Sequence, residues 1–250
     1  MRLALFSDIH ANLQALEACL EHARVQGARQ LAFLGDLVGY GAQPAPVVQR
    51  VMELAAQGAF VLKGNHDELA VRPPAENKSM GDSTALWTHD QLADEHRAFL
   101  DALPLMVRHE RVLLVHASVD APELWRYVYD APMAEISLDA ASAQEGVRYV
   151  FGGHVHRQSL YFRGADGRLI PFVPTAGVAV PVSPHRHWLA TIGSVGQPRD
   201  GSPKAMYALF DSTRAQLTFH RVAYDHQAAV AAIRRAGLSE FLASRLELGR

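Results

Sequence analysis

Short apolar runs and helical apolar repeats alternate along the first part of the chain. Runs at 3–7, 31–34 and 60–62 predict buried strands, because apolar runs of this length between polar residues are typical of strands within a sheet. Between them, 11–25 and 46–56 have apolar residues three and four positions apart, which is the spacing of one helix face. Strands that alternate with helices favour βαβ units and a mainly parallel sheet.

The pattern changes towards the C-terminus, where strands predominate. We expect a long helix over 82–103, strands over 105–108 and 112–115, a helix over 133–144, a strand over 147–151, a strand-rich segment over 158–222 and a helical segment over 227–248. We therefore predict a single domain over 1–250. Its α/β part lies at 1–156, its β-rich part with C-terminal helices lies at 157–250, and the two together form two packed sheets.

Composition and charge exclude several classes of protein. Hydrophobic residues make up 49% of the 250 residues and the formal net charge is −2, so no overall basic field favours nucleic acid or an anionic membrane. The one cysteine, Cys19, excludes an intramolecular disulfide, and its helical spacing from Leu16 and Leu20 places it in a core. The chain has no apolar run long enough to span a membrane and no signal-peptide pattern, so we expect a cytoplasmic protein. The sequence does not indicate its oligomeric state.

Residues of metal-ligand type follow five of the predicted strands. They are Asp8 and His10, Asp36, Asn65 and His66, His116, and His154 and His156. In open α/β sheets, sites form at the carboxyl ends of the strands, so we expect these side chains to meet. Residues two apart on an extended segment point to the same side, which aims Asp8 with His10, and His154 with His156, at a common point.

The order and spacing of these residues carry a family resemblance. The set Asp8-x-His10, Gly35-Asp36, Gly64-Asn65-His66-Asp67, His116 and Gly153-His154-x-His156 resembles the calcineurin-like metallophosphoesterase superfamily. The resemblance implies an α/β fold, a four-layer α/β/β/α sandwich of two mixed sheets, with two metals at the strand ends. It implies one metal held by Asp8, His10 and His156, a second held by Asn65, His116 and His154, and Asp36 as the bridge between them.

The donor chemistry fits this expectation independently. Carboxylate and imidazole suit two divalent or mixed-valence ions of Mn, Fe, Zn, Co or Ni, and no thiolate biases the choice. The charge of two such ions exceeds that of Asp8 and Asp36, which leaves the site net positive, as phosphate binding requires. A water bridging the ions becomes hydroxide that attacks phosphorus in line.

His66 and Asp67 are the predicted catalytic residues. On extended backbone Asn65 and His66 face opposite ways, so His66 is free to face the substrate if Asn65 binds a metal. The ordinary pKa of a histidine, about 6.5, suits a proton donor to the leaving group, and the resemblance implies the same role. Asp67 either orients His66 or caps the turn that follows.

Six residues are candidate substrate contacts: Asn12, Tyr40, Trp125, Tyr127, Ser194 and Arg199. Asn12 binds phosphate or caps a helix, and Tyr40 contacts substrate or anchors its loop. Trp125 and Tyr127, together with Tyr129 and Arg126, form an aromatic and basic wall for a nucleobase and phosphate, or bury one aromatic face in a hairpin or cap. Ser194 and Arg199 rest on the resemblance of their loop, 193–200, to a bacterial dinucleoside-polyphosphatase-like branch. The other histidines, His220 among them, are expected at the surface, and 185–187 in an exposed loop.

Two departures from the family pattern narrow the substrate. Gly39-Tyr40 stands where the protein-phosphatase branch has an Asp-Arg pair, and Ala117-Ser118 follows His116 where that branch has two Gly residues. Both weigh against a protein serine/threonine phosphatase, and the first also weighs against a symmetrical dinucleoside tetraphosphatase, which shares the Arg.

We therefore expect a dinuclear metal-dependent phosphoesterase that hydrolyses a phosphate ester or anhydride without a covalent enzyme intermediate. A small phosphorylated substrate is predicted, first a nucleotide such as a dinucleoside polyphosphate and next a general phosphodiester. The alternative from another class is a non-catalytic metal-binding interaction scaffold of the same fold, against which the complete ligand set argues. A nuclease is disfavoured by the net charge of −2.

Overall fold

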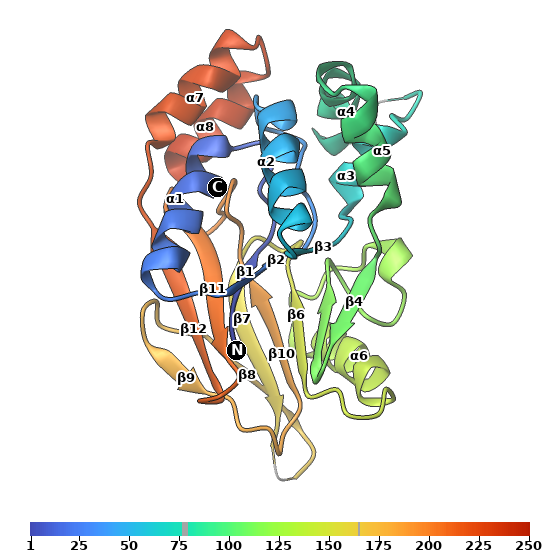
Figure 1. Ribbon diagram of the computed structural model, residues 1–250, viewed down its shortest axis with the longest axis vertical. Helices are drawn as coiled ribbons and strands as arrows, with labels where there is room; N and C mark the ends of the chain where they lie inside the picture. Colours follow the sequence, from blue (N-terminus) through green and yellow to red (C-terminus); the bar gives the residue numbers. More distant parts are fainter. Residues whose placement is uncertain (77–79, 165) are drawn as a thin grey trace.

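Two six-stranded sheets form the body of the molecule (Figure 1). The computed structural model describes residues 1–76, 80–164 and 166–250, and every element named below lies within them. The first sheet contains, in spatial order, β3 (Phe60–Val61), β2 (Gln30–Phe33), β1 (Arg2–Phe6), β11 (Ala205–Asp211), β12 (Gln216–Val222) and β9 (Ala179–Pro181). The second contains β4 (Met106–His109), β5 (Val112–Val115), β6 (Tyr149–Gly152), β10 (Trp188–Ile192), β7 (Gln158–Arg163) and β8 (Leu169–Phe172).

Both sheets are mixed, as expected. Strands β1, β2 and β3 pair in parallel, and so do β5, β6 and β10. The other described pairs are antiparallel. Strand β1 lies inside its sheet between β2 and β11. In its pairing with β11, Leu3 is opposite Phe210. The first strand of the chain therefore depends on a partner from its last fifth.

Helices cover the outer faces of both sheets, which makes four layers and confirms the predicted α/β/β/α sandwich. Helices α1 (Leu13–Val25) and α2 (Pro44–Ala56) pack on the first sheet, with α7 (His226–Arg235) and α8 (Glu240–Leu248) beside α1 (Figure 1). Helix α6 (Ala131–Ser142) packs on the second sheet, after the short η1 (Pro122–Leu124). Helices α3 (Asn65–Val71), α4 (Met80–Gln91) and α5 (Asp94–Ala102) group beyond β3.

Strand β1 shows why the first apolar run has no polar alternation. Leu3 and Leu5 pack into the core between the sheets, whereas Ala4 and Phe6 pack into the core under α1 and α2. A strand that is covered on both faces needs apolar side chains at successive positions. The run therefore marks a strand in an inner layer of the sandwich.

Two predicted helices are each divided in the structure. The segment 82–103 forms α4 and α5, because Ala93 adopts an extended conformation and Arg97 donates to the carbonyl oxygens of His89 and Leu92 near the end of α4. The segment 227–248 forms α7 and α8, because Gly237 turns the chain at φ +69°. Helix α3 was not predicted at all.

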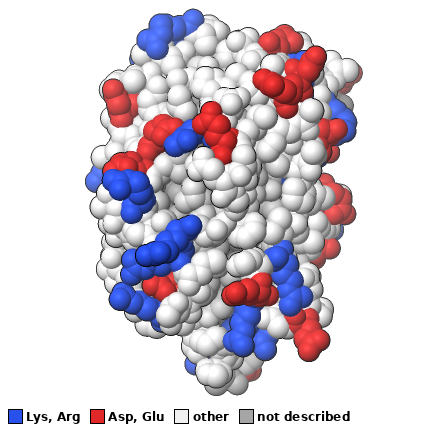
Figure 2. Space-filling model, in the orientation of Figure 1, with Lys and Arg blue, Asp and Glu red and all other residues white. Residues whose placement is uncertain are grey.

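The surface gives no sign of a single-sign charge field on the face shown in Figure 2, where Lys and Arg lie among Asp and Glu. Among the described residues, every helix is too short or too polar to cross a bilayer. The cytoplasmic location and the single-domain extent of 1–250 stay predictions.

Candidate metal centre

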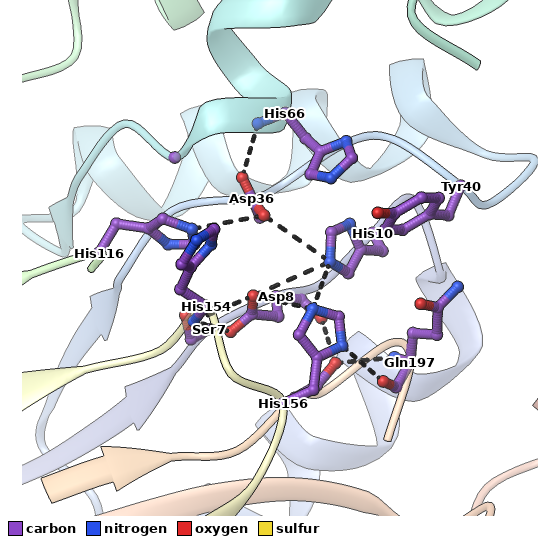
Figure 3. A network of polar contacts seen from close by, with 12 residues as sticks. Ser7, Asp8, His10, Asp36, Tyr40, His66, His116, His154, His156 and Gln197 are labelled. Atoms are coloured by element: carbon purple, nitrogen blue, oxygen red, sulfur yellow. Dashed lines mark hydrogen bonds and ion pairs between the residues drawn. The ribbon is translucent and has the colours of Figure 1, made fainter. Parts of the chain in front are cut away.

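Five loops bring seven buried side chains to one place at the carboxyl ends of the strands (Figure 3). The side chains are Asp8 and His10 after β1, Asp36 after β2, His66 at the start of α3, His116 after β5, and His154 and His156 after β6. None of the seven is more than 6% exposed. The loops are joined by backbone hydrogen bonds, for example from Val195 N to Ser7 O and from Gly196 N to Asp8 O, both 2.9 Å.

The backbone at these positions is not extended, which corrects the expected reason for their convergence. Five of the seven residues have positive φ, between +47° and +67°: Asp8, His10, Asp36, His154 and His156. The left-handed region costs a non-glycine residue about 1–2 kcal/mol. Such strain persists where the surroundings determine it, and it gathers at functional sites. Left-handed turns, not strand alternation, aim the paired side chains inward.

Glycines beside the ligand positions permit a very close approach of the loops. A Cβ atom on Gly153 would lie 1.8 Å from Ser7 Oγ and 2.5 Å from Asp8 Oδ2. A Cβ atom on Gly64 would lie 2.2 Å from Asp36 Oδ1. Any side chain at either position would therefore push a carboxylate of the centre aside.

The side chains form two clusters that Asp36 connects, and Asp36 and His10 also lie together with His66. In the first, His156 Nε2 lies 3.2 Å from Asp8 Oδ1 and 3.1 Å from His10 Nε2. In the second, Asp36 groups with His116 and His154, and its Oδ2 lies 3.4 Å from His116 Nε2. The same Oδ2 is 3.8 Å from His10 Nε2 in the first cluster. Asp36 is placed to serve both.

Three of the histidines have a defined tautomer. The Nδ1 atoms of His10, His116 and His156 donate to the carbonyl oxygens of Val38, Leu34 and Gln197 at 3.1, 2.7 and 2.7 Å. Because a carbonyl only accepts, each Nδ1 carries a hydrogen, so each ring turns Nε2 inward, with a free lone pair there when the ring is neutral. Two such lone pairs, on His10 and His156, face each other at 3.1 Å. A cation between the rings would relieve this repulsion.

Three further atoms at the centre are buried polar atoms without a hydrogen-bond partner among the described residues: Asn65 Oδ1, His116 Nε2 and His154 Nε2. An unpaired buried acceptor costs about 1–3 kcal/mol, so such atoms are rare unless something binds them. They are the donors expected for the second metal. The buried His and Asp clusters are therefore consistent with a dinuclear metal site.

The electrostatics favour the ligand forms of Asp36, His10 and His154, whereas at His116 burial is outweighed by the effect of Asp36, which raises the pKa to about 9. Burial opposes ionisation of Asp36, but the neighbouring His116 and His66 outweigh it and hold the Asp36 pKa well below its usual range. Burial, with His116 second, lowers the pKa of His154 to about 4. Burial, with His156 second, lowers the pKa of His10 well below 6.5. The carboxylate is thus ionised and these two imidazoles are neutral at neutral pH.

His66 lies beside the two clusters, at the start of a helix. Its backbone N donates to Asp36 Oδ1 at 2.8 Å, and its ring contacts those of His10 and Tyr40 at centroid distances of 5.0 and 4.4 Å. Asn65 and His66 open α3, so they point roughly 100° apart, which replaces the expected opposition on extended backbone. Burial lowers the pKa of His66, while Asp36 acts to raise it.

Asp67 binds backbone N–H groups, which supports the second of its two expected roles, the cap of the turn. Its carboxylate accepts from Leu37 N at 2.9 Å, Val38 N at 3.3 Å and Gly64 N at 2.9 Å. Burial and the nearby Asp36 raise the pKa of Asp67 to about 7, against the effect of these N–H donors. Asp67 caps α3 and ties it to the loop after β2.

Asn12 and Ser194 both form hydrogen bonds within the protein, and Asn12 has the second of its two expected roles, the cap of a helix. Asn12 Oδ1 accepts from Ala15 N and caps α1, and its Nδ2 donates to Gly196 O and Tyr224 Oη. Ser194 is 0% exposed, and its Oγ donates to Asp8 O at 2.7 Å. Both side chains use their polar atoms within the protein.

The remaining candidates lie at the rim of the centre. Tyr127 stacks on His154 with ring centroids 3.9 Å apart and is 49% exposed. The Arg199 guanidinium lies 5.6 Å from the Tyr40 ring centroid, and its Nη2 donates to Gln197 Oε1. Trp125 Nε1 donates to Glu68 Oε2 at 3.2 Å, which anchors that side chain towards α3.

Sequence reasoning missed the groups that orient the ligands. The carbonyls of Leu34, Val38 and Gln197 fix three imidazoles, and a backbone carbonyl leaves no residue-type signal. It also missed Arg157, directly after His156, and Arg245 on α8. The position of Arg157, a cation next to a ligand motif, is the signal that could have identified it.

Comparisons with known proteins agree with this geometry. Residues 1–215 match the model of the calcineurin-like phosphoesterase superfamily domain. A metallophosphoesterase from Sphaerobacter thermophilus has a crystal structure 36% identical in sequence, with a TM-score of 0.88 over 100% of this chain and 99% of its own. An uncharacterized protein of Methanocaldococcus jannaschii is 32% identical over 254 residues, 99% of this chain and 98% of its own length.

A more distant structure extends the likeness in fold. A hypothetical protein from Pyrococcus horikoshii has 18% sequence identity and a TM-score of 0.78, over 100% of this chain and 98% of its own. At that identity, the likeness concerns the fold alone.

Proposed function

The chain belongs to the calcineurin-like phosphoesterase superfamily and is a metal-dependent phosphoesterase, and we propose that it hydrolyses a small nucleotide-type phosphate ester or anhydride at a dinuclear centre. The observation that carries this proposal is the position of Asp36 between two buried clusters, each with inward-facing imidazole nitrogens. Asp8, His10 and His156 would hold one ion, Asn65, His116 and His154 the other, and Asp36 both.

Two divalent ions there would polarise the phosphoryl oxygens and acidify a water molecule. The chain's own part is to fix the donors before substrate arrives. The carbonyls of Val38, Leu34 and Gln197 hold the rings of His10, His116 and His156, so little reorganisation is needed when the reaction occurs.

His66 is the proposed proton donor to the leaving oxygen. Its ring lies beside Asp36 and His10 and packs against Tyr40, at the side of the centre where the loop after β2 passes. Burial lowers its pKa, and a bound phosphate anion would act in the opposite direction and favour the protonated ring. The proton would pass from this imidazolium to the departing oxygen.

The rim supports a nucleotide-type substrate. Tyr127 exposes half of its ring beside His154, which suits contact with a base or sugar. Arg199 places a guanidinium over Tyr40, the position at which the protein-phosphatase branch has its Arg. The cation therefore comes from a different loop in this chain. A dinucleoside polyphosphate is our first substrate candidate.

The experiment compares wild type with His66→Ala after chelation and reloading with excess Mn. Bound metal is counted by elemental analysis, and hydrolysis is followed with bis(p-nitrophenyl) phosphate, p-nitrophenyl phosphate and diadenosine tetraphosphate. We expect two metals per chain in both proteins and a loss of about 10²–10⁴-fold in turnover in the variant. His185→Ala, in the exposed loop before β10, is the matched control and should keep its activity.

Each other outcome has a definite meaning. Equal turnover in His66→Ala would refute the proton-donor role. Loss of one metal would instead make His66 a ligand, a role that its closeness to His10 and Asp36 permits. Two bound metals with no turnover of any substrate by the wild type would favour a binding scaffold. Turnover of the diester alone would favour a general phosphodiesterase.

A further inference from the structure

A cleft runs from the metal centre towards α8. Its inner part, of about 200 Å³, is lined by Tyr127, Tyr129, Arg157 and Arg199, and includes Val155 between two of the proposed ligands. Its outer part, of about 880 Å³, shares Tyr129, Arg157, Ser159 and Arg199 with the inner part, so the two adjoin, and together they are here called the distal cleft. A cavity of this size accommodates a nucleotide-sized ligand.

The charge of the distal cleft is strongly one-sided. Arg157, Arg199, Arg221 and Arg245 all line its outer part. Asp200 is the one carboxylate side chain among the lining residues, and Arg221 Nη1 already bonds it at 3.0 Å. Within the described ranges, no carboxylate lies within ion-pair distance of Arg157, Arg199 or Arg245. On the face shown in Figure 2, by comparison, Lys and Arg lie among Asp and Glu.

The arginines also oppose one another. Arg245 is partly buried, with its guanidinium 5.0 Å from the Phe241 ring, and burial together with the like charge of Arg199 lowers the pKa of Arg245. Like charges held close together without an anion are unfavourable, and a phosphate group between them would reverse the sign of the interaction. Arginine is the residue best suited to bind phosphate oxygens in pairs.

One wall of the distal cleft is aromatic. Tyr129 lines both its inner and outer parts and is 70% exposed, far more than a tyrosine that serves packing. Tyr127, in the inner part, is stacked on His154. A flat apolar ring beside a row of guanidinium groups matches a ligand that has a base at one end and several phosphates.

We propose that the distal cleft binds the phosphate chain of a nucleoside polyphosphate beyond the phosphate that reacts at the metal centre, with Arg157 and Arg245 on the chain and Tyr129 on the base. The proposal rests on the proposed function, because it names the substrate class of the same site. It requires that affinity increase with the number of linked phosphates and that these arginines account for the increase.

The test is calorimetric binding of ATP, inorganic tripolyphosphate and orthophosphate to the metal-loaded chain in a His66→Ala background, in which turnover is expected to be slow, under identical free-metal conditions. The variants are Arg245→Gln, Arg157→Gln and Tyr129→Ala, with Arg235→Gln as the matched control. Arg235 is exposed on α7, so its substitution removes the same charge at a position outside the distal cleft. Each arginine variant in the distal cleft should raise the Kd of ATP and tripolyphosphate about tenfold, and that of orthophosphate less than twofold. Tyr129→Ala should weaken ATP alone.

Several results would overturn the proposal. An unchanged Kd for tripolyphosphate in both arginine variants would remove the distal cleft from binding. An equal increase in Kd in Arg235→Gln would mean that the overall positive charge of the protein, and not the distal cleft, accounts for the effect. Equal affinity for ATP and tripolyphosphate, insensitive to Tyr129→Ala, would replace the nucleoside by inorganic polyphosphate. Because binding is measured without turnover, a failure of the wild type to hydrolyse any of the three substrates named above would refute the proposed function and leave the result on the distal cleft separate.

Discussion

The core between the two sheets and the metal centre are both closed to solvent, yet they are built in opposite ways. The core consists of apolar side chains on regular strands, such as Leu5 and Phe210. The metal centre consists of polar side chains on left-handed turns just beyond the same strands, such as Asp8 after β1. The first arrangement gains free energy from burial, whereas the second places strain and unpaired donors where a ligand is to bind. The residues that stabilise the fold and the residues proposed to bind metal are thus only a few positions apart along each strand.

The largest effect on stability should come from Phe210→Ala. Phe210 is 0% exposed and contacts the rings of Tyr149 and Phe151 at centroid distances of 4.7 and 5.2 Å. Truncation leaves a cavity between the sheets and should lower the free energy of unfolding by about 3–5 kcal/mol, measured by urea denaturation. Metal content per folded chain should not change. Phe172→Ala, on a side chain 43% exposed at the edge strand β8, is the control and should have a much smaller effect. An equal loss in both would mean that the core does not behave as a packed interior.

The largest effect on chemistry should come from Asp36→Asn. The change keeps the shape of the side chain but removes the charge that would serve both ions, so we expect the loss of at least one metal. Turnover should fall roughly 10²–10³-fold, with a smaller shift of the urea midpoint than in Phe210→Ala. Elemental analysis and steady-state kinetics measure the two quantities. Asp94→Asn, on a side chain 99% exposed, should leave both unchanged. Full metal content with normal turnover in Asp36→Asn would contradict its bridging position.

A smaller effect, at the boundary of the two regions, should come from Gly153→Ala. The added methyl group would meet Ser7 Oγ at 1.8 Å, so the loop after β6 must move and carry His154 with it. We expect a cost of about 1–3 kcal/mol in unfolding free energy, together with weaker metal binding. The neighbouring Gly152→Ala is a close control, because its methyl group would meet nothing nearer than 3.4 Å. If both variants bound metal like the wild type, close approach of the loops would not matter for the centre.

The two regions also differ in how far the sequence predicts them. Apolar runs located the strands up to residue 152 one by one, since burial acts directly on residue type, whereas the strands within 158–222 were predicted only as a strand-rich segment. The ordered motifs brought Asp8, Asp36, His116 and His156 together correctly, because the carboxyl ends of neighbouring strands share one edge. The turn geometry was not predicted, since positive φ at Asp8 or His10 leaves no mark on residue type outside glycine.

The sequence could not predict which side chains bind distant backbone groups. Asn12 and Ser194 lie close to the motifs in sequence, but their hydrogen bonds to Gly196 and Asp8 come from the fold of the loops. His220 was expected at the surface and is 8% exposed, because Tyr207 on the neighbouring strand stacks on it at 4.8 Å. Single-sequence patterns carry no information on such pairs. The same holds for Arg245, which the fold brings to the distal cleft from the last helix.

The pairing of β1 with β11 has a consequence for biosynthesis. Strand β1 leaves the ribosome first, but its neighbour, with Phe210 opposite Leu3, is made only after most of the chain has emerged. Until then one edge of β1 is open, and open edges invite pairing with other chains. The loop whose Val195 and Gly196 bind the backbone at Ser7 and Asp8 is made just before β11. A nascent chain that already contains every proposed ligand therefore still lacks the segments that hold the first of them in place.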